Sequence, residues 1–280
     1  MSKLKRKKWL RSQEVLSGKN TSILSVILSL NLAIVPLAHA TPEIIADKIE
    51  GVRGLIPITD NFIYQGDLFQ NQSAKEFYSV AARLSDHRDL VLRFEVRNGD
   101  RAIFDHDDRD RAEAMSQEVF GKDQVVWNAY RVKIAKNFSI SENKNAYFII
   151  GQWHGSKEDG RSPYIAIQMN GNKLSVIRRF IVNGEVRKDI MYEIDGIDRD
   201  VWTNIAIEHR VSDNNGILNV WIAGHQVVRF SGPVGYTDHY AGGYWKFGIY
   251  RNRQMTDASV EYRDVVVGTD EMIERALLSD

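Results

Sequence analysis

The most constraining feature of the sequence is a series of short β-type runs, each closed by residues that favour turns. Runs rich in Val, Ile, Tyr, Phe and Trp with an apolar–polar alternation are typical of half-buried strands. Asn170-Gly171-Asn172 and Asn183-Gly184 separate such runs and predict hairpins. The predicted strands are 89–96, 145–154, 162–169, 173–182, 202–211, 216–224, 244–252 and 258–267.

Only two segments have a helical pattern, a short one at 75–84 and a terminal one at 270–278. Many short strands at this turn spacing predict an all-β fold. We expect a concanavalin-like β-jelly-roll sandwich of two antiparallel sheets, one of which curves to form a concave substrate groove.

The first forty residues predict a signal peptide. A basic leader precedes an uncharged apolar run, residues 23–37, and Ala38-His39-Ala40 gives the small-x-small pattern of a cleavage site. The run is also long enough for a marginal membrane anchor, but its Ser, Asn and Pro residues favour cleavage. We therefore expect a secreted or periplasmic protein that starts near Thr41, with an N-terminal arm and first strand at 41–75 forming one domain with 76–280.

Removal of residues 1–40 changes the charge of the chain. The leader holds seven of the 37 basic and one of the 37 acidic residues, so 30 basic and 36 acidic residues remain, a formal charge of −6. A mildly acidic protein is a poor candidate for nucleic-acid binding. There is no cysteine, which excludes disulfides and a thiol nucleophile. We expect a soluble monomer with no membrane contact after cleavage.

The segment YWKFGIYRN combines polar and apolar residues at two-residue spacing, so as a strand it has two different faces. The apolar face holds Trp245, Phe247 and Ile249, and the polar face holds Tyr244, Lys246, Gly248, Tyr250 and Asn252. We expect Gly248, lacking a side chain, to leave the backbone open to a sugar ring.

Three other segments also combine a polar set with an opposing small or apolar set. The polar sets are Arg111 with Glu113, Gln152 with His154, and Tyr164 with Gln168; Trp153 opposes the second set together with Ile149 and Gly151. Polar and aromatic side chains that share a concave sheet face suit an extended polysaccharide.

These segments resemble the signature strands of the jelly-roll polysaccharide lyases. Arg111-Ala112-Glu113, Gln152-Trp153-His154 and the run from Tyr244 to Tyr250 are similar to R-[ST]-E-L, Q-[IV]-H and Y-F-K-A-G-x-Y of alginate lyases. The form KFGIYR, with a Trp202 strand followed by GILNVWIAG, is closer to the heparin lyase I and glucuronan lyase branch. Ala114, Trp153 and Phe247 depart from the alginate lyase pattern and bear on substrate identity.

The resemblance implies cleavage of a uronic-acid-containing polysaccharide by β-elimination, which leaves 4,5-unsaturated ends. It implies that Gln152 and Arg111 neutralise the uronate carboxylate, that His154 assists or acts as base, and that Tyr250 acts as acid and in some members also as base. Lys246 would support the tyrosine or bind a carboxylate, and Glu113 would orient Arg111. The remaining candidate substrate contacts, beside Glu113, are Tyr164, Gln168, Tyr244 and Asn252.

The substrate and the mode of action stay open. The acidic charge places glucuronan-like or weakly sulfated uronans first, alginate next and heparin-type chains last. Endo and exo action depend on loops at the groove ends, such as residues 155–161 and 233–243.

Two other functions remain possible from the residues alone. Glu193, Asp195 and Asp198 resemble the E-x-D-x-x-E carboxylates of jelly-roll glycoside hydrolases, and the same sandwich serves non-catalytic carbohydrate-binding domains. Product chemistry separates these functions, because only a lyase releases unsaturated ends.

The acidic run 104–110 is compatible with structural calcium but lacks the glycine and terminal glutamate of a known calcium loop. We interpret it as a structural turn and predict neither a metal nor another cofactor.

Overall fold

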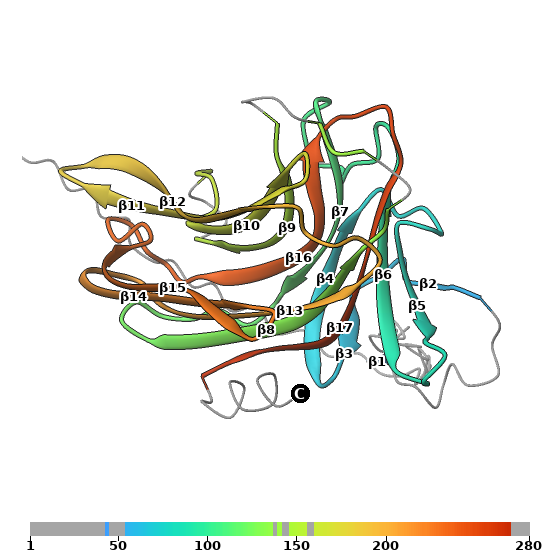
Figure 1. Cartoon of the computed structure of the whole chain (residues 1–280), viewed down its shortest axis with the longest axis horizontal. Helices are drawn as coiled ribbons and strands as arrows, with labels where there is room; N and C mark the ends of the chain where they lie inside the picture. The colour runs from blue at the N-terminus through green and yellow to red at the C-terminus, as the bar shows by residue number, and fades with distance from the viewer. Residues whose placement is uncertain (1–42, 45–53, 137–138, 142–145, 156–159, 270–280) are drawn as a thin grey trace, which may run out of the picture. The chain divides into compact units, whose positions relative to one another are not determined.

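The computed structural model describes residues 43–44, 54–136, 139–141, 146–155 and 160–269, all of which belong to the unit formed by residues 40–280. Two sheets form this unit, and their layers face each other in Figure 1. The groove sheet, in spatial order, contains β1 (Glu43–Ile44), β3 (Phe62–Tyr64), β4 (Asp67–Ser73), β7 (Arg109–Ser116), β16 (Tyr244–Asn252), β9 (Phe148–His154), β10 (Ile165–Asn170), β11 (Lys173–Val182) and β12 (Glu185–Asp195). The back sheet contains β15 (His225–Val234), β14 (Ser212–Ile222), β13 (Trp202–Arg210), β8 (Val125–Ile134), β17 (Ala258–Gly268), β6 (Leu90–Val96), β5 (Val80–Leu84) and β2 (Ile56–Pro57).

The predicted jelly-roll sandwich is confirmed. Strand pairs in both sheets are antiparallel apart from β1 with β3, and the described residues contain no helix. The predicted helix at 75–84 is wrong, because Val80–Leu84 pairs with β2 and β6 and buries Val80, Ala81 and Ala82. The predicted terminal helix at 270–278 and the predicted signal peptide lie outside the described residues.

Aromatic side chains fill the space between the sheets. Phe247 of β16 makes edge contacts with Phe94 of β6 and Tyr262 of β17, with ring centroids 5.3 and 5.1 Å apart. Trp245 stacks on Phe247 with ring centroids 4.8 Å apart, and both Trp245 and Trp153 are fully buried. Each such buried side chain stabilises the fold by roughly 1.5–3 kcal/mol. The core therefore fixes the strands whose opposite faces line the groove.

The turn residues determine the hairpin that forms one edge of the groove sheet. Asn183 and Gly184 both have positive φ, 53° and 78°, as a two-residue type I′ hairpin requires. They join β11 to β12 in the register Val182↔Glu185. The second hairpin predicted from sequence, at Asn170-Gly171-Asn172, joins β10 to β11.

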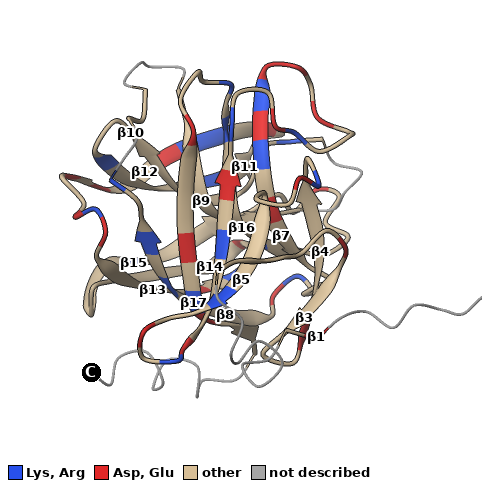
Figure 2. Ribbon diagram, turned by 90° about the vertical axis from the view of Figure 1, so that its right-hand side faces the viewer, with Lys and Arg blue, Asp and Glu red and all other residues tan. Residues whose placement is uncertain are grey.

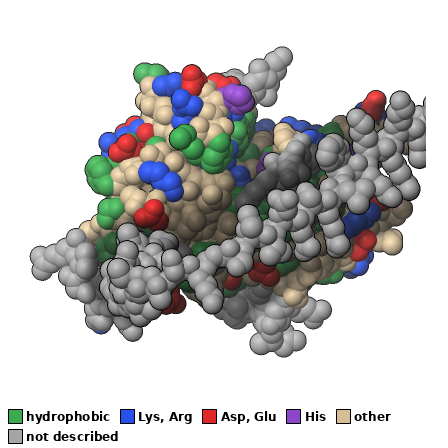
Figure 3. All heavy atoms as spheres, turned by 180° about the vertical axis from the view of Figure 1, so that it is seen from behind, with side chains coloured by type: hydrophobic (Ala, Val, Ile, Leu, Met, Phe, Trp, Pro, Cys, Tyr) green, Lys and Arg blue, Asp and Glu red, His purple; other side chains and the backbone are tan. Residues whose placement is uncertain are grey.

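Charged side chains of both signs cover the outer surfaces. At one end of β7, basic and acidic residues also alternate (Figure 2), although Asp110 and Arg111 there are buried. On the face seen in Figure 3, lysine and arginine side chains lie among aspartate and glutamate side chains. Among the residues that the structure describes, no helix is long and apolar enough to cross a membrane.

Candidate active site

Three neighbouring strands of the groove sheet bring the predicted catalytic side chains together. Strand β16 lies between β7 and β9, and its residues Lys246, Phe247, Tyr250 and Arg251 have a partner on both sides. Tyr250 pairs with Arg111 of β7, and Lys246 pairs with Gln152 of β9. Toward the same end of β9, His154 pairs with Tyr244. Residues far apart in the sequence thus face one groove.

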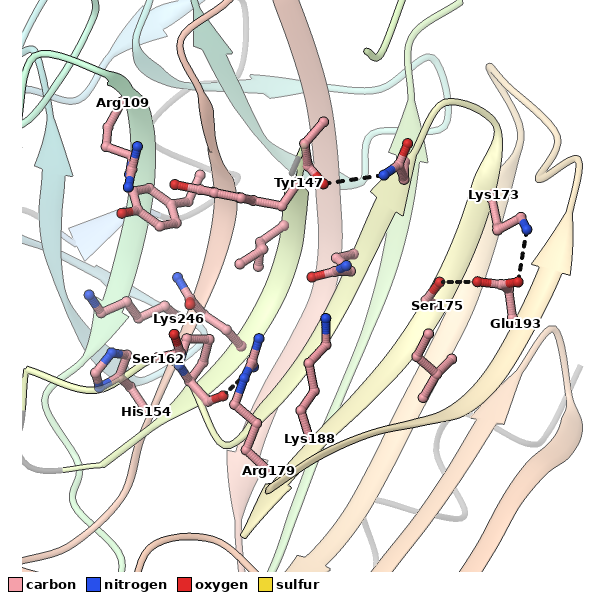
Figure 4. Close-up of a pocket in the computed structure, with 18 of the residues that line it drawn as sticks. Arg109, Tyr147, His154, Ser162, Lys173, Ser175, Arg179, Lys188, Glu193 and Lys246 are labelled. Atoms are coloured by element: carbon pink, nitrogen blue, oxygen red, sulfur yellow. Dashed lines mark hydrogen bonds and ion pairs between the residues drawn. The ribbon is translucent and has the colours of Figure 1, made fainter. Parts of the chain in front are cut away.

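The groove has a volume of about 920 Å³ and crosses the strands from β7 to β12. It is lined by all five predicted catalytic residues, Arg111, Gln152, His154, Lys246 and Tyr250. Figure 4 shows His154 and Lys246 at one side of the site, and Glu193, Lys173 and Ser175 at the other. This volume accommodates several sugar rings side by side.

Arg111 is held by two carboxylates. Its Nε and Nη2 donate to the two oxygens of Asp105, each over 2.7 Å, and its Nη1 donates to Glu113. Arg111 and Asp105 side chains are only 7% and 6% exposed. Burial acts to lower the pKa of Arg111, but the charges of Glu113 and Asp105 outweigh it and raise that pKa. The guanidinium is therefore a fixed, charged element with most of its donors already used.

Glu113 connects Arg111 to Gln152. Its second carboxylate oxygen accepts a hydrogen bond of 2.5 Å from Gln152 Nε2, and the Glu113 side chain is only 1% exposed. This contact fixes the amide orientation, because a carboxylate requires the NH₂ group to face it. Glu113 is not among the residues that line the groove. Its position fits the predicted orienting role rather than direct substrate contact.

Tyr250 lies among two arginines and a second tyrosine. The guanidinium carbon of Arg111 lies 4.0 Å from its ring centroid, and the Tyr147 ring lies 5.4 Å away, centroid to centroid. Its hydroxyl is within hydrogen-bonding reach of Arg109 and of Tyr147. A phenol in such a cationic setting is suited to acid–base work.

His154 stacks on its cross-strand partner. The rings of His154 and Tyr244 are 5.7 Å apart and nearly parallel, at 17°, and His154 Nδ1 is 3.3 Å from the Gly155 carbonyl oxygen. The Lys246 ammonium lies 5.6 Å from the centre of the same Tyr244 ring. Tyr244 is 5% exposed. Tyr244 therefore packs beside His154 and Lys246, two side chains that line the groove.

The other predicted substrate contacts have different positions. Gln168 lines the groove, whereas Asn252 uses its Oδ1 to accept a 2.9 Å hydrogen bond from the Tyr147 amide. The prediction that Tyr164 faces the groove is wrong. Tyr164 belongs to the core and its hydroxyl lies 3.2 Å from His209 Nε2. It precedes β10 at a bend, where the strict two-residue alternation does not hold.

Gly248 does not open the backbone to a sugar ring, contrary to the expectation. Its φ is +124°, and a Cβ there would lie 2.3 Å from the Ala112 carbonyl oxygen and 2.9 Å from the Phe94 ring. The pairing of β16 with β9 shifts between Phe247 and Tyr250. Glycine is thus required by a β-bulge that packs tightly on β7 and the core.

A second irregularity changes which residues of β9 face the groove. The pairing of β9 with β10 shifts between Gly151 and Ile149. Ile149 therefore lies on the groove side, packed with Tyr250, and not with Trp153 as the alternation predicted. The same shift places Tyr147 in the groove, which counting back from His154 did not indicate.

Several basic residues of the groove were not predicted from sequence. The lining contains seven arginine and lysine side chains and two carboxylates, so it is more basic than the chain as a whole. The unpredicted cations are Arg109, Arg161, Lys173, Arg179 and Lys188. Arg109 continues the odd-numbered alternation of Arg111 and is predictable from the sequence. Lys173, Arg179 and Lys188 depend on how β11 and β12 cross the sheet, and Arg161 lies in the segment before β10.

Arg179 and Lys188 form a cationic pair in the middle of the groove. They are cross-strand partners on β11 and β12, and both extend toward the groove in Figure 4. Burial lowers the pKa of Arg179, whose Nη1 donates to the Pro163 carbonyl oxygen over 2.6 Å. This pair suits a second acidic group on a polymer.

Two of the three carboxylates considered for hydrolysis line the groove. Glu193 accepts hydrogen bonds from Lys173 Nζ (2.8 Å) and Ser175 Oγ (3.3 Å), and the Lys173 contact lowers the pKa of Glu193. A hydrolase needs a carboxylic acid with a raised pKa. Asp198 is exposed and does not line the groove.

The acidic run 104–110 is used in ion pairs. Asp105 binds Arg111, Asp107 binds Arg101 and Asp108 binds Arg109. Within the described ranges, no group of three His, Asp or Glu side chains is placed to hold a metal ion. The loop therefore positions basic side chains at the groove.

Comparison with known proteins identifies the family. The family model for polysaccharide lyases matches residues 64–267. The endo-β-1,4-glucuronan lyase of the fungus Trichoderma reesei is similar in fold, with a TM-score of 0.51 and 14% identity over 65% of this chain and 82% of that chain. Alginate lyase PA1167 of Pseudomonas aeruginosa gives a TM-score of 0.47 and 15% identity over 68% and 86%, and alginate lyase AlyA1 of Zobellia galactanivorans gives 0.46 and 12% over 70% and 82%.

A search of curated protein sequences finds no match to the chain. The likeness to the glucuronan lyase, at 14% identity, shows a shared fold. The family model spans well over half of the chain, and it coincides with the strands that carry the groove. The chain therefore belongs to the polysaccharide lyase family.

Proposed function

We propose that this polysaccharide lyase cleaves a uronic-acid-containing polysaccharide by β-elimination. The observation that carries the proposal is the shared groove of Arg111, Gln152, His154, Lys246 and Tyr250, contributed by three adjacent strands. Basic groups dominate this groove although the chain without residues 1–40 is acidic. An anionic polymer is therefore the substrate that the site suits best.

The first requirement of β-elimination is to reduce the negative charge of the uronate carboxylate. Loss of the C5 proton places further charge on that carboxylate, so donors must face it as the charge develops. Lys246 and Gln152, which are cross-strand partners, supply an ammonium and the second N–H of the amide whose first N–H binds Glu113. Arg111, which also lines the groove, adds a fixed positive charge, since most of its own donors are engaged by Asp105 and Glu113.

Proton transfer is assigned to His154 and Tyr250. A base takes the C5 proton, the C4–O4 bond breaks with its electron pair on O4, and an acid gives O4 a proton. The product has a C4=C5 double bond. Tyr250, between Arg111 and Arg109, is the acid, and either His154 or Tyr250 itself is the base.

The test is a panel of uronic-acid polymers digested with purified protein and followed by ultraviolet absorbance. A rise in absorbance with new reducing ends on at least one polymer supports β-elimination. New reducing ends without absorbance indicate hydrolysis, and binding without new ends indicates a non-catalytic module. Either of the last two results contradicts the proposal.

We further propose that the protein acts outside the cytoplasm as a monomer, after removal of residues 1–40. The basic leader, the apolar run and Ala38-His39-Ala40 support export. Sequencing of the N-terminus of the exported protein tests the cleavage, with Thr41 expected as the first residue. Light scattering of that protein tests the monomer.

A further inference from the structure

Tyr250 is flanked by a second phenol that the mechanism above does not use. Tyr147 precedes β9 and lines the groove. Its ring lies 5.4 Å from the Tyr250 ring, and its hydroxyl is within hydrogen-bonding reach of the Tyr250 hydroxyl. Its backbone amide is fixed by Asn252 Oδ1 over 2.9 Å. The position of the Tyr147 ring is thus set by the strand that carries Tyr250.

Arg109 completes a group of three side chains around the same oxygen. Its guanidinium carbon lies 5.6 Å from the Tyr147 ring centroid, and it is within hydrogen-bonding reach of Tyr250. Figure 4 shows the Tyr147 side chain extending toward the Arg109 guanidinium. Asp108 binds Arg109 from the side, and Arg111 covers the face of the Tyr250 ring. The charged and titratable groups around Tyr250 are thus Arg109, Arg111, Asp108 and Tyr147.

The two hydroxyls have different surroundings. Burial, followed by the proximity of Tyr250, raises the pKa of Tyr147. Tyr147 therefore keeps its proton and serves as a hydrogen-bond donor over the working pH range. A neutral donor and a guanidinium that meet at one phenol oxygen resemble the donor pairs that stabilise developing oxyanions.

We propose that Tyr147 and Arg109 are positioning residues that stabilise negative charge on the Tyr250 oxygen during the reaction. When Tyr250 gives its proton to O4, or takes up the C5 proton from its ionised form, its oxygen carries negative charge at one stage. The Tyr147 hydroxyl and the Arg109 guanidinium donate to that oxygen and keep it oriented toward the sugar. This inference rests on the proposed β-elimination and adds two residues to it.

The test is Tyr147→Phe, which keeps the ring contact with Tyr250 and removes only the hydroxyl. We expect kcat to fall about 10- to 100-fold with KM within about twofold, as for loss of one charge-stabilising hydrogen bond. The alkaline limb of the pH–rate profile should move to higher pH. Arg109→Met should act in the same direction, and Arg109→Lys should restore part of the rate.

Tyr64→Phe is the matched control, because Tyr64 lies outside the groove lining and its hydroxyl donates to the Leu90 carbonyl oxygen over 3.0 Å. It should keep the wild-type kcat and pH profile. An unchanged kcat and pH profile in folded Tyr147→Phe would overturn the inference while leaving β-elimination in place. A wild-type protein that gives no unsaturated product from any uronan would instead contradict the proposed function itself.

Discussion

The guanidinium carbon of Arg111 lies 4.0 Å above the centre of the Tyr250 ring, while its nitrogens bind Asp105 and Glu113. One side chain thus joins the acidic loop before β7, the orienting carboxylate and the proposed acid of the reaction. The contact exists because Arg111 and Tyr250 are cross-strand partners on neighbouring strands. Changes to this arrangement should affect both stability and activity.

We expect Asp105→Asn to destabilise the fold by about 1–3 kcal/mol, because Asp105 supplies two of the hydrogen bonds to a buried guanidinium. Urea unfolding measures the loss. Asp107→Asn is the control, since Asp107 is 83% exposed and its ion pair with Arg101 should contribute little. Equal stability of the two variants would contradict the structural role of Asp105.

We expect Gly248→Ala to destabilise the protein by roughly 2–4 kcal/mol, through backbone strain and a clash with the Ala112 carbonyl oxygen. Gly184→Ala is the matched control. Gly184 also has positive φ, +78°, but open space surrounds its added Cβ, so only the strain of about 1 kcal/mol applies. The difference between their free energies of unfolding measures the contact with β7, and no difference would contradict the tight packing at the bulge.

The stability of the protein should fall as the pH drops below about 6.5, partly because of His209. Burial lowers the pKa of His209 to about 3, from the ordinary histidine value of 6.5. Between these values the unfolded chain binds a proton that the folded chain does not, so the free energy of unfolding rises with pH in this window. Above pH 6.5 this contribution is constant.

His209→Gln should therefore flatten the pH dependence between pH 6.5 and 4, by up to about 1.4 kcal/mol per pH unit. The measurement is chemical unfolding at several pH values, and the slopes of the two proteins are compared. Identical slopes would contradict this prediction, because they would mean that His209 binds a proton equally in the folded and the unfolded chain. His225→Gln, which replaces an exposed histidine on β15, is the control variant.

The carboxylates at the β12 end of the groove should weaken binding of a fully anionic polymer. We expect Glu193→Gln to lower KM for a polyuronate about two- to fivefold at low salt, because it removes a like charge from the groove. The effect should vanish at high salt. Glu185→Gln, at the exposed hairpin end, should leave KM unchanged. A KM for Glu193→Gln that equals the wild-type value would mean that the polymer does not reach this end.

Residues 244–252 show how far the sequence alone determines the site. The strand has the predicted bounds, its Trp245, Phe247 and Ile249 are in the core, and Tyr250 faces the groove. This succeeds because a long alternation with large apolar residues leaves only one face to bury. The hairpin at Asn183 and Gly184 is also predictable from the sequence, because few residues other than asparagine and glycine adopt the positive φ that its turn requires.

The errors arise where alternation is interrupted. The bulge at Ile149–Gly151 changes which residues of β9 face the groove, and the bulge at Gly248 packs the backbone against β7 instead of opening it to a ligand. A single sequence does not mark either bulge beyond the presence of glycine. Strand β12 is exposed and rich in charged residues, as a loop is, so the sequence does not predict that its cations and carboxylates line the groove. Tyr164 was misplaced because a bend precedes β10. The apolar–polar alternation predicts which side chains face the groove only where no bulge or bend interrupts the strand.

The most direct test of the account compares unsaturated-end formation by wild type, His154→Ala and Tyr250→Phe on a uronan that the wild type cleaves. Both variants should fold normally and lose about 100- to 10,000-fold in kcat, as expected for removal of a general acid or base. A folded variant of either kind that releases unsaturated ends at the wild-type rate would contradict the assignment of proton transfer to these two residues.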